Sequence, residues 1–325
     1  MLLDFLKTYA TLIESEIHQL NLPETPKTLY EPQRYILASK AKRVRPMLTL
    51  MATGMCGESI EKGIPAALAV ELVHNFSLIH DDIMDQADSR RGSETVHIKW
   101  DESTAILSGD GMLIQAMIQL HYVADNVDHK KLSRVFLEGI NKVCEGQALD
   151  MEFENRLNVT PDEYMDMISG KTGALISVSL VMGGICAKAD QKKLEALSEV
   201  GYSLGRAFQV QDDILDVIAD PEKFGKKKGG DIYEGKKTYL MLKLLERCNK
   251  EDGKWLINCL ENKAMNQDDV LRVINLYEKY GIIDDAESLM KTYYLKAEKA
   301  LEIFEETKYK GDLLQLINFL KNREF

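Results

Sequence analysis

The sequence predicts an all-α fold, and three features of its 325 residues support this class. Apolar residues recur at helical spacing, for example in the run that contains Leu194, Leu197, Val200 and Leu204. The chain has seven prolines, and most of them lie where a helix would begin or end. Strand-like alternation is weak, and no Asn-Gly or Asp-Gly pair joins two strand-like runs. We therefore expect long helices in a single domain over residues 1–325.

The predicted helices begin at recognisable sequence signals. Thr160 is suited to cap a helix, Pro161 to occupy its first turn, and Glu163 to complete a capping box. We expect helices over residues 164–187, 192–216, 286–304 (capped by Asp284 or Asp285) and 312–321 (capped by Asp312). Residues 220–237 form one long irregular stretch, which we interpret as a loop at a functional edge.

The composition is that of a folded protein with an acidic balance. The 41 basic and 52 acidic residues give a net charge of −11, which disfavours nonspecific binding to nucleic acid. The five cysteines form no C-x-x-C pair, as is typical of reduced thiols in the cytoplasm, and the lack of H-E-x-x-H argues against zinc. The N-terminus lacks the pattern of a signal peptide. Residues 172–187 are too few and too rich in glycine to predict a membrane span, so we expect a buried core helix there.

Two acidic clusters with the pattern D-D-x-x-D, at residues 81–85 and 212–216, are the most informative motifs. On a helix, residues i and i+4 share a face, as do i+1 and i+4, so each cluster gathers carboxylates on one side of a turn. Like charges at this spacing destabilise a helix by roughly 0.2–0.5 kcal/mol per pair. A cation would relieve this repulsion, and hard oxygen ligands favour Mg²⁺ together with substrate phosphates. The alternative for one motif is a solvated acidic helix end, and the presence of a second motif disfavours it.

Two basic segments are suited to bind phosphate. Arg-Arg-Gly at residues 90–92 follows the first acidic motif closely, and guanidinium groups match the geometry of phosphate oxygens. Lys-Arg-Val-Arg-Pro at residues 42–46 precedes an apolar segment, and Pro46 suits the first position of a helix whose N-terminus would attract anions. The alternative for each segment is a solvated surface patch.

The lysine-rich stretch at residues 225–238 matches a P-loop only in part. Gly230 to Lys236 fits G-x-x-x-x-G-K, but Lys237 stands at the Ser/Thr position and no strand precedes the loop. We interpret this stretch as a lid over a metal-bound phosphate, with a solvated charged loop as the alternative. Lys171 begins a long apolar run, where a lone lysine usually extends its amine to water.

One arrangement accounts for all of these motifs. Carboxylates hold Mg²⁺, Mg²⁺ and the basic residues hold diphosphate, and a mostly apolar helical interior holds a hydrocarbon tail. Two basic segments suggest two diphosphate substrates. Preorganised positive charge would stabilise a departing diphosphate, and a dry interior would protect the reactive cation left behind.

In content and order, these motifs resemble the trans-isoprenyl diphosphate synthase (polyprenyl synthetase) family, closest in pattern to short-chain archaeal-type geranylgeranyl and farnesyl diphosphate synthases. Lys171-Thr172-Gly173 and the Phe208-Gln209 pair before the second acidic motif also match. The resemblance implies an isoprenoid-synthase-type bundle of long helices around a central cavity, active as a homodimer. It implies head-to-tail condensation of isopentenyl diphosphate with dimethylallyl, geranyl or farnesyl diphosphate to give geranylgeranyl diphosphate, with farnesyl diphosphate as a second released product.

The resemblance also implies roles for individual residues. Two or three Mg²⁺ ions per active site would be held by Asp81, Asp82, Asp85, Asp212, Asp213 and Asp216. Isopentenyl diphosphate would be bound by Lys42, Arg45, His74 and Arg91. The allylic diphosphate would be bound by Arg90, Lys171, Thr172, Gln209, Lys226 and Lys236, of which Lys171, Gln209 and Lys226 are the predicted catalytic residues. For His74, a hydrogen-bonded core histidine is the alternative.

Product length is predicted from the residues before the first acidic motif. In the family, bulk at this position forms the floor of the tail cavity. Phe76 lies five residues before Asp81, about 7.5 Å along a helix axis, and Ser77 is small. This combination resembles that of enzymes with a geranylgeranyl product. Two departures from the family pattern occur: Lys40-Ala41 stands in place of Gly-Gly, and Glu94 stands in place of proline.

Three alternative functions remain at this point. A medium- or long-chain polyprenyl diphosphate synthase would share the motifs. A class I terpene cyclase would share the first acidic motif, but its second metal motif usually mixes Asn, Ser or Thr with Glu. A non-catalytic partner subunit would often lack motif aspartates, whereas this chain has all six.

Overall fold

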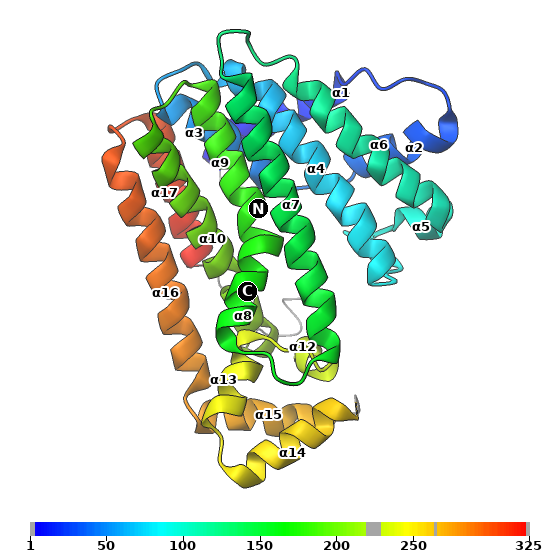
Figure 1. Ribbon diagram of the computed structural model, residues 1–325, viewed down its shortest axis with the longest axis vertical. Helices are drawn as coiled ribbons and strands as arrows, with labels where there is room; N and C mark the ends of the chain where they lie inside the picture. The colour runs from blue at the N-terminus through cyan, green and yellow to red at the C-terminus, as the bar shows by residue number, and fades with distance from the viewer. Residues whose placement is uncertain (1–3, 219–228, 263–264, 323–325) are drawn as a thin grey trace. The chain divides into compact units, whose positions relative to one another are not determined.

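The fold is all-α, as predicted (Figure 1). The computed structural model describes residues 4–218, 229–262 and 265–322. Within these ranges the strands are limited to the two-residue β1 (Ser89–Arg90) and β2 (Ser93–Glu94). The chain divides into two units, one of Met1–Ile140, Ser177–Ser198 and Ile303–Leu313, the other of Asn141–Ile176, Glu199–Glu302 and Leu314–Phe325. That residues 1–325 form a single domain stays a prediction.

Unit 1 is built around helix α4, which carries the first acidic motif. Residues 66–73 of α4 are all buried, and the helix packs against α3 and α6. Within the unit, the buried Tyr9 Oη donates to Asp312 Oδ2 at 2.6 Å. The elements of this unit are α1 (Asp4–His18), α2 (Lys27–Leu37), α3 (Val44–Met55), η1 (Ile60–Gly63), α4 (Ile64–Met84), β1, β2, α5 (Val96–Lys99) and α6 (Glu102–Leu120).

Unit 2 holds the second acidic motif near the C-terminal end of α10. Its own elements are α8 (Pro161–Ile168), η2 (Ser169–Gly173), α12 (Gly230–Tyr233), α13 (Tyr239–Arg247), α14 (Lys250–Glu261), α15 (Gln267–Lys279) and α16 (Ile282–Ala300). Helices α7 (His129–Asn155), α9 (Ala174–Cys186), α10 (Gln191–Ile218) and α17 (Lys308–Lys321), with the short η3 (Leu301–Ile303), contribute residues to both units.

Most predicted helices are confirmed, although some of their starts differ. The capping box of Thr160 and Glu163 is present, and residues 191–218 form one helix. Helix α16 begins at Ile282 because Gly281 takes a left-handed conformation (φ 63°) at its N-cap, so Asp284 and Asp285 lie inside the first turn. Helix α17 likewise begins before Asp312, and α3 begins before Pro46. The left-handed backbone of the N-cap residue sets the start of α16 at Gly281 and of α3 at Arg43, and the sequence patterns used above do not encode this conformation.

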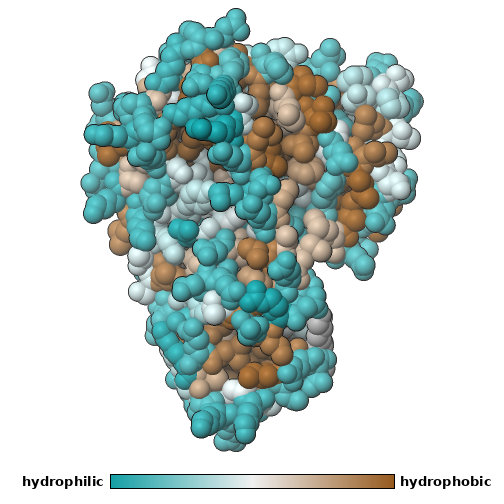
Figure 2. Space-filling view, in the orientation of Figure 1, coloured by the Kyte–Doolittle hydropathy of each residue, from teal (hydrophilic) through white to brown (hydrophobic). Residues whose placement is uncertain are grey.

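One segment, Pro161–Cys186, is long and apolar enough to cross a membrane by length and composition. In the structure 78% of its most apolar window is buried, as expected for a core helix. Apolar side chains also reach the surface of the protein, and one such region lies over α6 (Figure 2).

Candidate active site

The predicted site residues divide between the two units, and each unit holds one acidic motif. Unit 1 contains the end of α4, the β1–β2 hairpin and the start of α3. Unit 2 contains the end of α10, the π-helix η2 and the residues that follow α12. Lys226, predicted to bind the allylic diphosphate, lies outside the described residues.

The first acidic motif forms the last turn of α4. Asp85 is the C-cap residue, and its N–H donates to the carbonyl of Asp81 at 2.8 Å. The carboxylates therefore lie at the negative end of the helix dipole, an unfavourable place for an anion unless a cation is close. Asp82 is only 1% exposed and accepts a hydrogen bond from Arg90 Nε at 2.6 Å. Burial raises the pKa of Asp82, and the Arg90 guanidinium opposes this shift.

Arg90 and Arg91 lie on a two-residue β-hairpin that the sequence patterns did not predict. Arg91 (φ 55°) and Gly92 (φ 77°) both have positive φ, which is the requirement of a type I′ turn. On the partner strand, the carbonyl of Glu94 accepts a hydrogen bond from Tyr35 Oη at 2.9 Å. The hairpin places Arg90 beside the first motif, where it donates to Asp82.

The residues of the basic segment 42–46 have different surroundings: Arg43 is buried in ion pairs, and Lys42 is exposed. Arg43, in a left-handed conformation at the N-cap of α3, is 3% exposed. Its guanidinium contacts Glu14 Oε1 at 2.7 Å and Glu71 Oε1 at 2.5 Å. Arg43 thus neutralises the buried Glu71 and the half-buried Glu14, whereas Lys42 is exposed just before the helix.

Arg45 and His74 form the centre of the predicted isopentenyl diphosphate site. Arg45 Nη1 lies 3.2 Å from His74 Nε2. Because arginine offers only donors, Nε2 is the acceptor and the histidine proton lies on Nδ1. Arg45 Nε is buried, and within the part of the chain that the structure describes it has no hydrogen-bond partner. An unpaired buried donor beside a second arginine, Arg91, fits an anionic ligand.

The tail-length residues lie on α4 between His74 and the aspartates. Ser77 Oγ donates to the carbonyl of His74 at 2.9 Å. The ring of Phe76 packs edge-to-face on His80, with 4.8 Å between ring centroids. Both Phe76 and Ser77 are half-buried.

In unit 2, the middle aspartate of the second motif is buried in the same way as Asp82. Asp213 is 3% exposed. Its Oδ2 accepts from Tyr164 Oη at 2.6 Å and from the Tyr239 N–H at 3.3 Å, and its Oδ1 accepts from Gln209 Nε2 at 3.4 Å. Burial raises the pKa of Asp213 to about 8, although the hydrogen bond from Tyr164 opposes the shift. Sequence reasoning missed Tyr164, for which helical periodicity offers no signal beyond a core position.

Lys171 lies in η2, a π-helical turn between α8 and α9. Its Nζ contacts Asp150 Oδ2 at 2.5 Å, and the neighbouring Thr172 Oγ1 donates to Gln209 Oε1 at 3.3 Å. A Cβ added at Gly146 of α7 would lie 2.1 Å from the backbone nitrogen of Lys171, so only glycine permits this approach. The sequence analysis did not predict Asp150 as a site residue, because its partner Lys171 lies 21 residues further along the chain.

The remaining residues of the second motif contact the segment around α12. Asp216 Oδ2 accepts from the Asp231 N–H at 3.1 Å. Lys236 Nζ contacts Glu234 Oε2 at 2.7 Å and Asp231 Oδ1 at 3.3 Å. The structure therefore places Lys236 in the same unit and neighbourhood as the second motif.

The donor set of the two motifs fits a hard divalent cation such as Mg²⁺. Both motifs offer only carboxylate oxygens, and in each the middle aspartate is buried against protein donors. Among residues 4–218, 229–262 and 265–322, no three acidic, histidine or cysteine side chains already form a metal-binding group. Mg²⁺ usually takes only one or two carboxylates and completes its shell with water and substrate phosphate.

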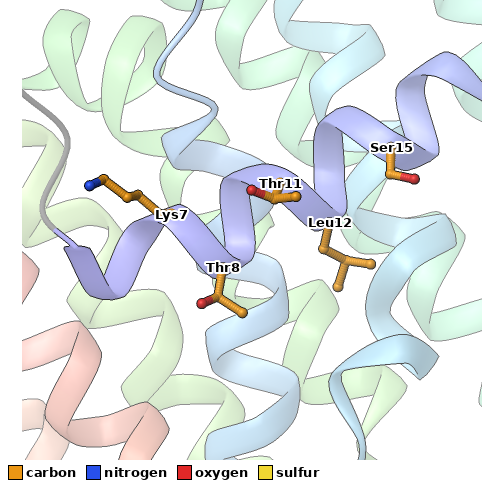
Figure 3. Close-up of a pocket in the computed structure, with 5 residues that line it drawn as sticks. All are labelled: Lys7, Thr8, Thr11, Leu12 and Ser15. Atoms are coloured by element: carbon orange, nitrogen blue, oxygen red, sulfur yellow. The ribbon is translucent and has the colours of Figure 1, made fainter.

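A separate surface groove of about 570 Å³ runs along α1 (Figure 3). Its lining residues are Lys7, Thr8, Thr11, Leu12 and Ser15. It includes none of the predicted site residues, and we assign it no role.

The environment of His74 predicts a pH-dependent stability. Burial, followed by the charges of Arg45 and Arg91, lowers the His74 pKa well below 6.5. The unfolded chain therefore binds a proton more readily than the native one, and the free energy of unfolding falls as pH drops below about 6.5. We expect His74→Gln to lose less stability than the unsubstituted protein between pH 7 and 5 in urea titrations. One group contributes up to about 1.4 kcal/mol per pH unit, and equal slopes for the two proteins would contradict this assignment.

Comparison with known proteins agrees with the geometry. Residues 26–277 match the sequence model of the family described as "Polyprenyl synthetase". The chain is 37% identical over 322 residues to the short chain isoprenyl diphosphate synthase of Methanothermobacter thermautotrophicus, covering 99% of this chain and 98% of that protein. It is 36% identical to the geranylgeranyl diphosphate synthase of Methanosarcina mazei, covering 100% and 98%.

A solved structure supports the same relationship. The crystal structure of geranylgeranyl pyrophosphate synthetase from Pyrococcus horikoshii aligns with a TM-score of 0.92 and 39% identity, over 98% of this chain and 97% of that one. With the acidic motifs at two helix ends, the arginine hairpin and these matches together, the chain belongs to the polyprenyl synthetase family.

Proposed function

We propose that this protein is a trans-prenyltransferase that condenses isopentenyl diphosphate head-to-tail with allylic diphosphates to give geranylgeranyl diphosphate, with some farnesyl diphosphate released. The observation that carries the proposal is the paired acidic helix ends, each with its middle aspartate anchored inward, together with the cluster of Arg45, Arg91 and neutral His74. Relatives named geranylgeranyl diphosphate synthase support the product. A cytoplasmic location is part of the proposal.

Each part of the site has a distinct task in this reaction. Arg45, Arg91 and His74 bind the diphosphate of isopentenyl diphosphate, with Lys42 at the rim. Lys171 and Lys236 hold the allylic diphosphate, helped by Arg90, by Thr172 and Gln209 and by the predicted residue Lys226. The allylic C–O bond breaks with its electron pair on diphosphate, the isopentenyl double bond attacks the carbocation, and a proton is released.

The family uses Mg²⁺, and the motif carboxylates are its proposed ligands. When bound, Mg²⁺ neutralises the leaving diphosphate. We assign direct contact to Asp81, Asp85 and Asp212, with Asp216 in support. We assign orientation of the two motifs to Asp82 and Asp213, because both are buried and a donor of their own unit holds each of them: Arg90 for Asp82 and Tyr164 for Asp213. Two or three ions per active site are proposed from the resemblance to the family.

A product assay tests the function. Labelled isopentenyl diphosphate is incubated with Mg²⁺ and, in separate reactions, dimethylallyl, geranyl or farnesyl diphosphate, and the alcohols are chromatographed after phosphatase treatment. We expect mainly geranylgeraniol (C20) from every primer, since the floor at Phe76 limits the tail. Products of C30 or longer would indicate a long-chain synthase. A volatile hydrocarbon from farnesyl diphosphate alone would indicate a cyclase.

Removing one metal-binding charge from either motif should abolish most of the turnover. We expect Asp81→Asn and Asp212→Asn each to lower kcat by about 10²–10³-fold or more, because each removes stabilisation of charge that develops in the transition state. Asp125→Asn, at an exposed position remote in sequence from both motifs, is the matched control and should retain full activity. Near-normal kcat in either motif variant would refute the assigned role.

A homodimer is proposed from the exposed apolar face of α6. Ile106, Leu107, Ile114, Met117 and Ile118 are between 39% and 62% exposed, and several recur at helical spacing. An apolar strip of this kind on a folded chain is typical of a protein interface.

We expect Leu107→Asp to shift the protein from dimer to monomer at micromolar concentration in light scattering, because a charge placed in an apolar interface loses its hydration without a partner. Leu295→Asp is the control, since Leu295 of α16 is similarly exposed (57% against 62%) but lies elsewhere. A monomeric unsubstituted protein, or equal dissociation by both substitutions, would exclude α6 as the interface.

A further inference from the structure

The side of α4 that faces α6 carries two aromatic rings one helical turn apart. The Phe76 and His80 rings meet edge-to-face at 4.8 Å with an interplanar angle of 67°. This is the arrangement that aromatic quadrupoles prefer, and such pairs contribute beyond the apolar area they bury. The half-buried Phe76 ring therefore has a specific partner.

His80 is itself held from α6. Its Nε2 lies 3.2 Å from the carbonyl oxygen of Ile106, which only accepts, so Nε2 carries the proton and donates. Nε2 also lies 3.8 Å from Asp110 Oδ1. A Cβ added at Gly109 would stand 2.4 Å from His80 Nε2, so the absence of a side chain at Gly109 creates the space that the imidazole fills.

The position of Phe76 on helix α4 does not by itself direct its ring toward the face that carries the aspartates. At about 100° per residue, Ser77 lies about 40° around α4 from Asp81, whereas Phe76 lies about 140° away. Ser77 therefore shares the face of the aspartates, and Phe76 does not. The direction of the Phe76 ring is therefore set by the side chain that it packs against, which is His80.

We propose that His80 is a positioning residue for product length: seated against Gly109 and bonded to the Ile106 carbonyl, it fixes the Phe76 ring that ends chain growth. This inference rests on the proposed function, in which Phe76 is the floor of the tail site. Without His80 the Phe76 ring gains rotamers, and some of them leave room for another isoprene unit. Product length then depends on the α4–α6 contact as well as on the size of residue 76.

The experiment measures the ratio of products longer than C20 to C20 in the labelled assay, for His80→Ala, Phe76→Ala and the double variant. Each single variant should raise this ratio about tenfold, the discrimination that a hydrophobic pocket typically provides. Because His80 acts through Phe76, the double variant should match Phe76→Ala, whereas independent sites would multiply their effects. An unchanged ratio in His80→Ala, or multiplied effects in the double variant, would overturn the proposal.

A pair of glycine substitutions on α6 tests the same contact without altering either ring. Gly109→Ala pushes on His80 and should raise the ratio. Gly111→Ala is matched in helix and chemistry, but its Cβ would meet Gln33 Nε2 of α2 at 2.5 Å, so it should leave the ratio unchanged. Thermal melts followed by circular dichroism show whether each variant is folded. Equal ratios for the two glycine variants would also overturn the proposal.

The readout separates this inference from the proposed function. His80 neighbours Asp81, so total turnover can fall in His80→Ala, but the product ratio is internally normalised. If the unsubstituted protein forms no labelled prenyl product, the proposed function fails. If it forms geranylgeranyl diphosphate and the ratio does not respond to His80 or Gly109, only the positioning role fails.

Discussion

The constraint on which the site depends is the accumulation of like charge at two helix ends. Each acidic motif places three carboxylates in the last turns of a helix, where the dipole is already negative. In both units the protein resolves part of this conflict by burying the middle carboxylate against its own donors. Asp82 takes the guanidinium of Arg90, and Asp213 takes the hydroxyl of Tyr164 and a backbone N–H. Two different sets of partners thus give the same result, a buried middle carboxylate that is held by donors of its own unit.

Unit 1 also holds a cluster of positive charge, formed by Arg43, Arg45 and Arg91 around His74. Arg43, Arg45 and Arg91 act electrostatically on His74, and Glu71 is the buried acid that offsets part of their charge. Since Glu14, which also contacts Arg43, and Glu71 supply two carboxylates against three guanidinium groups, the cluster keeps an excess of positive charge. Neutral His74 adds hydrogen-bonding capacity without adding to the repulsion. An anion that carries more than one charge, such as diphosphate, satisfies both the excess charge and the unpaired Nε of Arg45.

The parts of this structure that depend on local chemistry were predictable from the sequence, and those that depend on distant partners were not. The capping box at Thr160 and the long apolar periodicities predicted their helices. The spacing of the aspartates placed each acidic motif on a helix, where the structure has it. By contrast, the inward turn of Arg43 depends on Glu14 and Glu71, which lie 29 and 28 residues away. The arginine hairpin requires a positive φ at Arg91, which no propensity favours, and the π-helical turn at Lys171 has no signal in apolar spacing.

Glycines where helices meet allow close approaches that position individual residues, and apolar sequence patterns do not predict these approaches. In unit 2, Gly146 admits the backbone of Lys171, and a Cβ at Gly205 would lie 2.3 Å from Cα of Gly173 at the end of the same π-helical turn. In unit 1, Gly109 admits the His80 ring one residue before the first acidic motif. At each place the missing side chain lets a neighbouring helix approach so closely that a functional residue has little freedom to move. The placement of Lys171 and of His80, to which we assign different tasks in the proposed function, therefore depends in both units on a missing Cβ, which admits backbone at Gly146 and a side chain at Gly109.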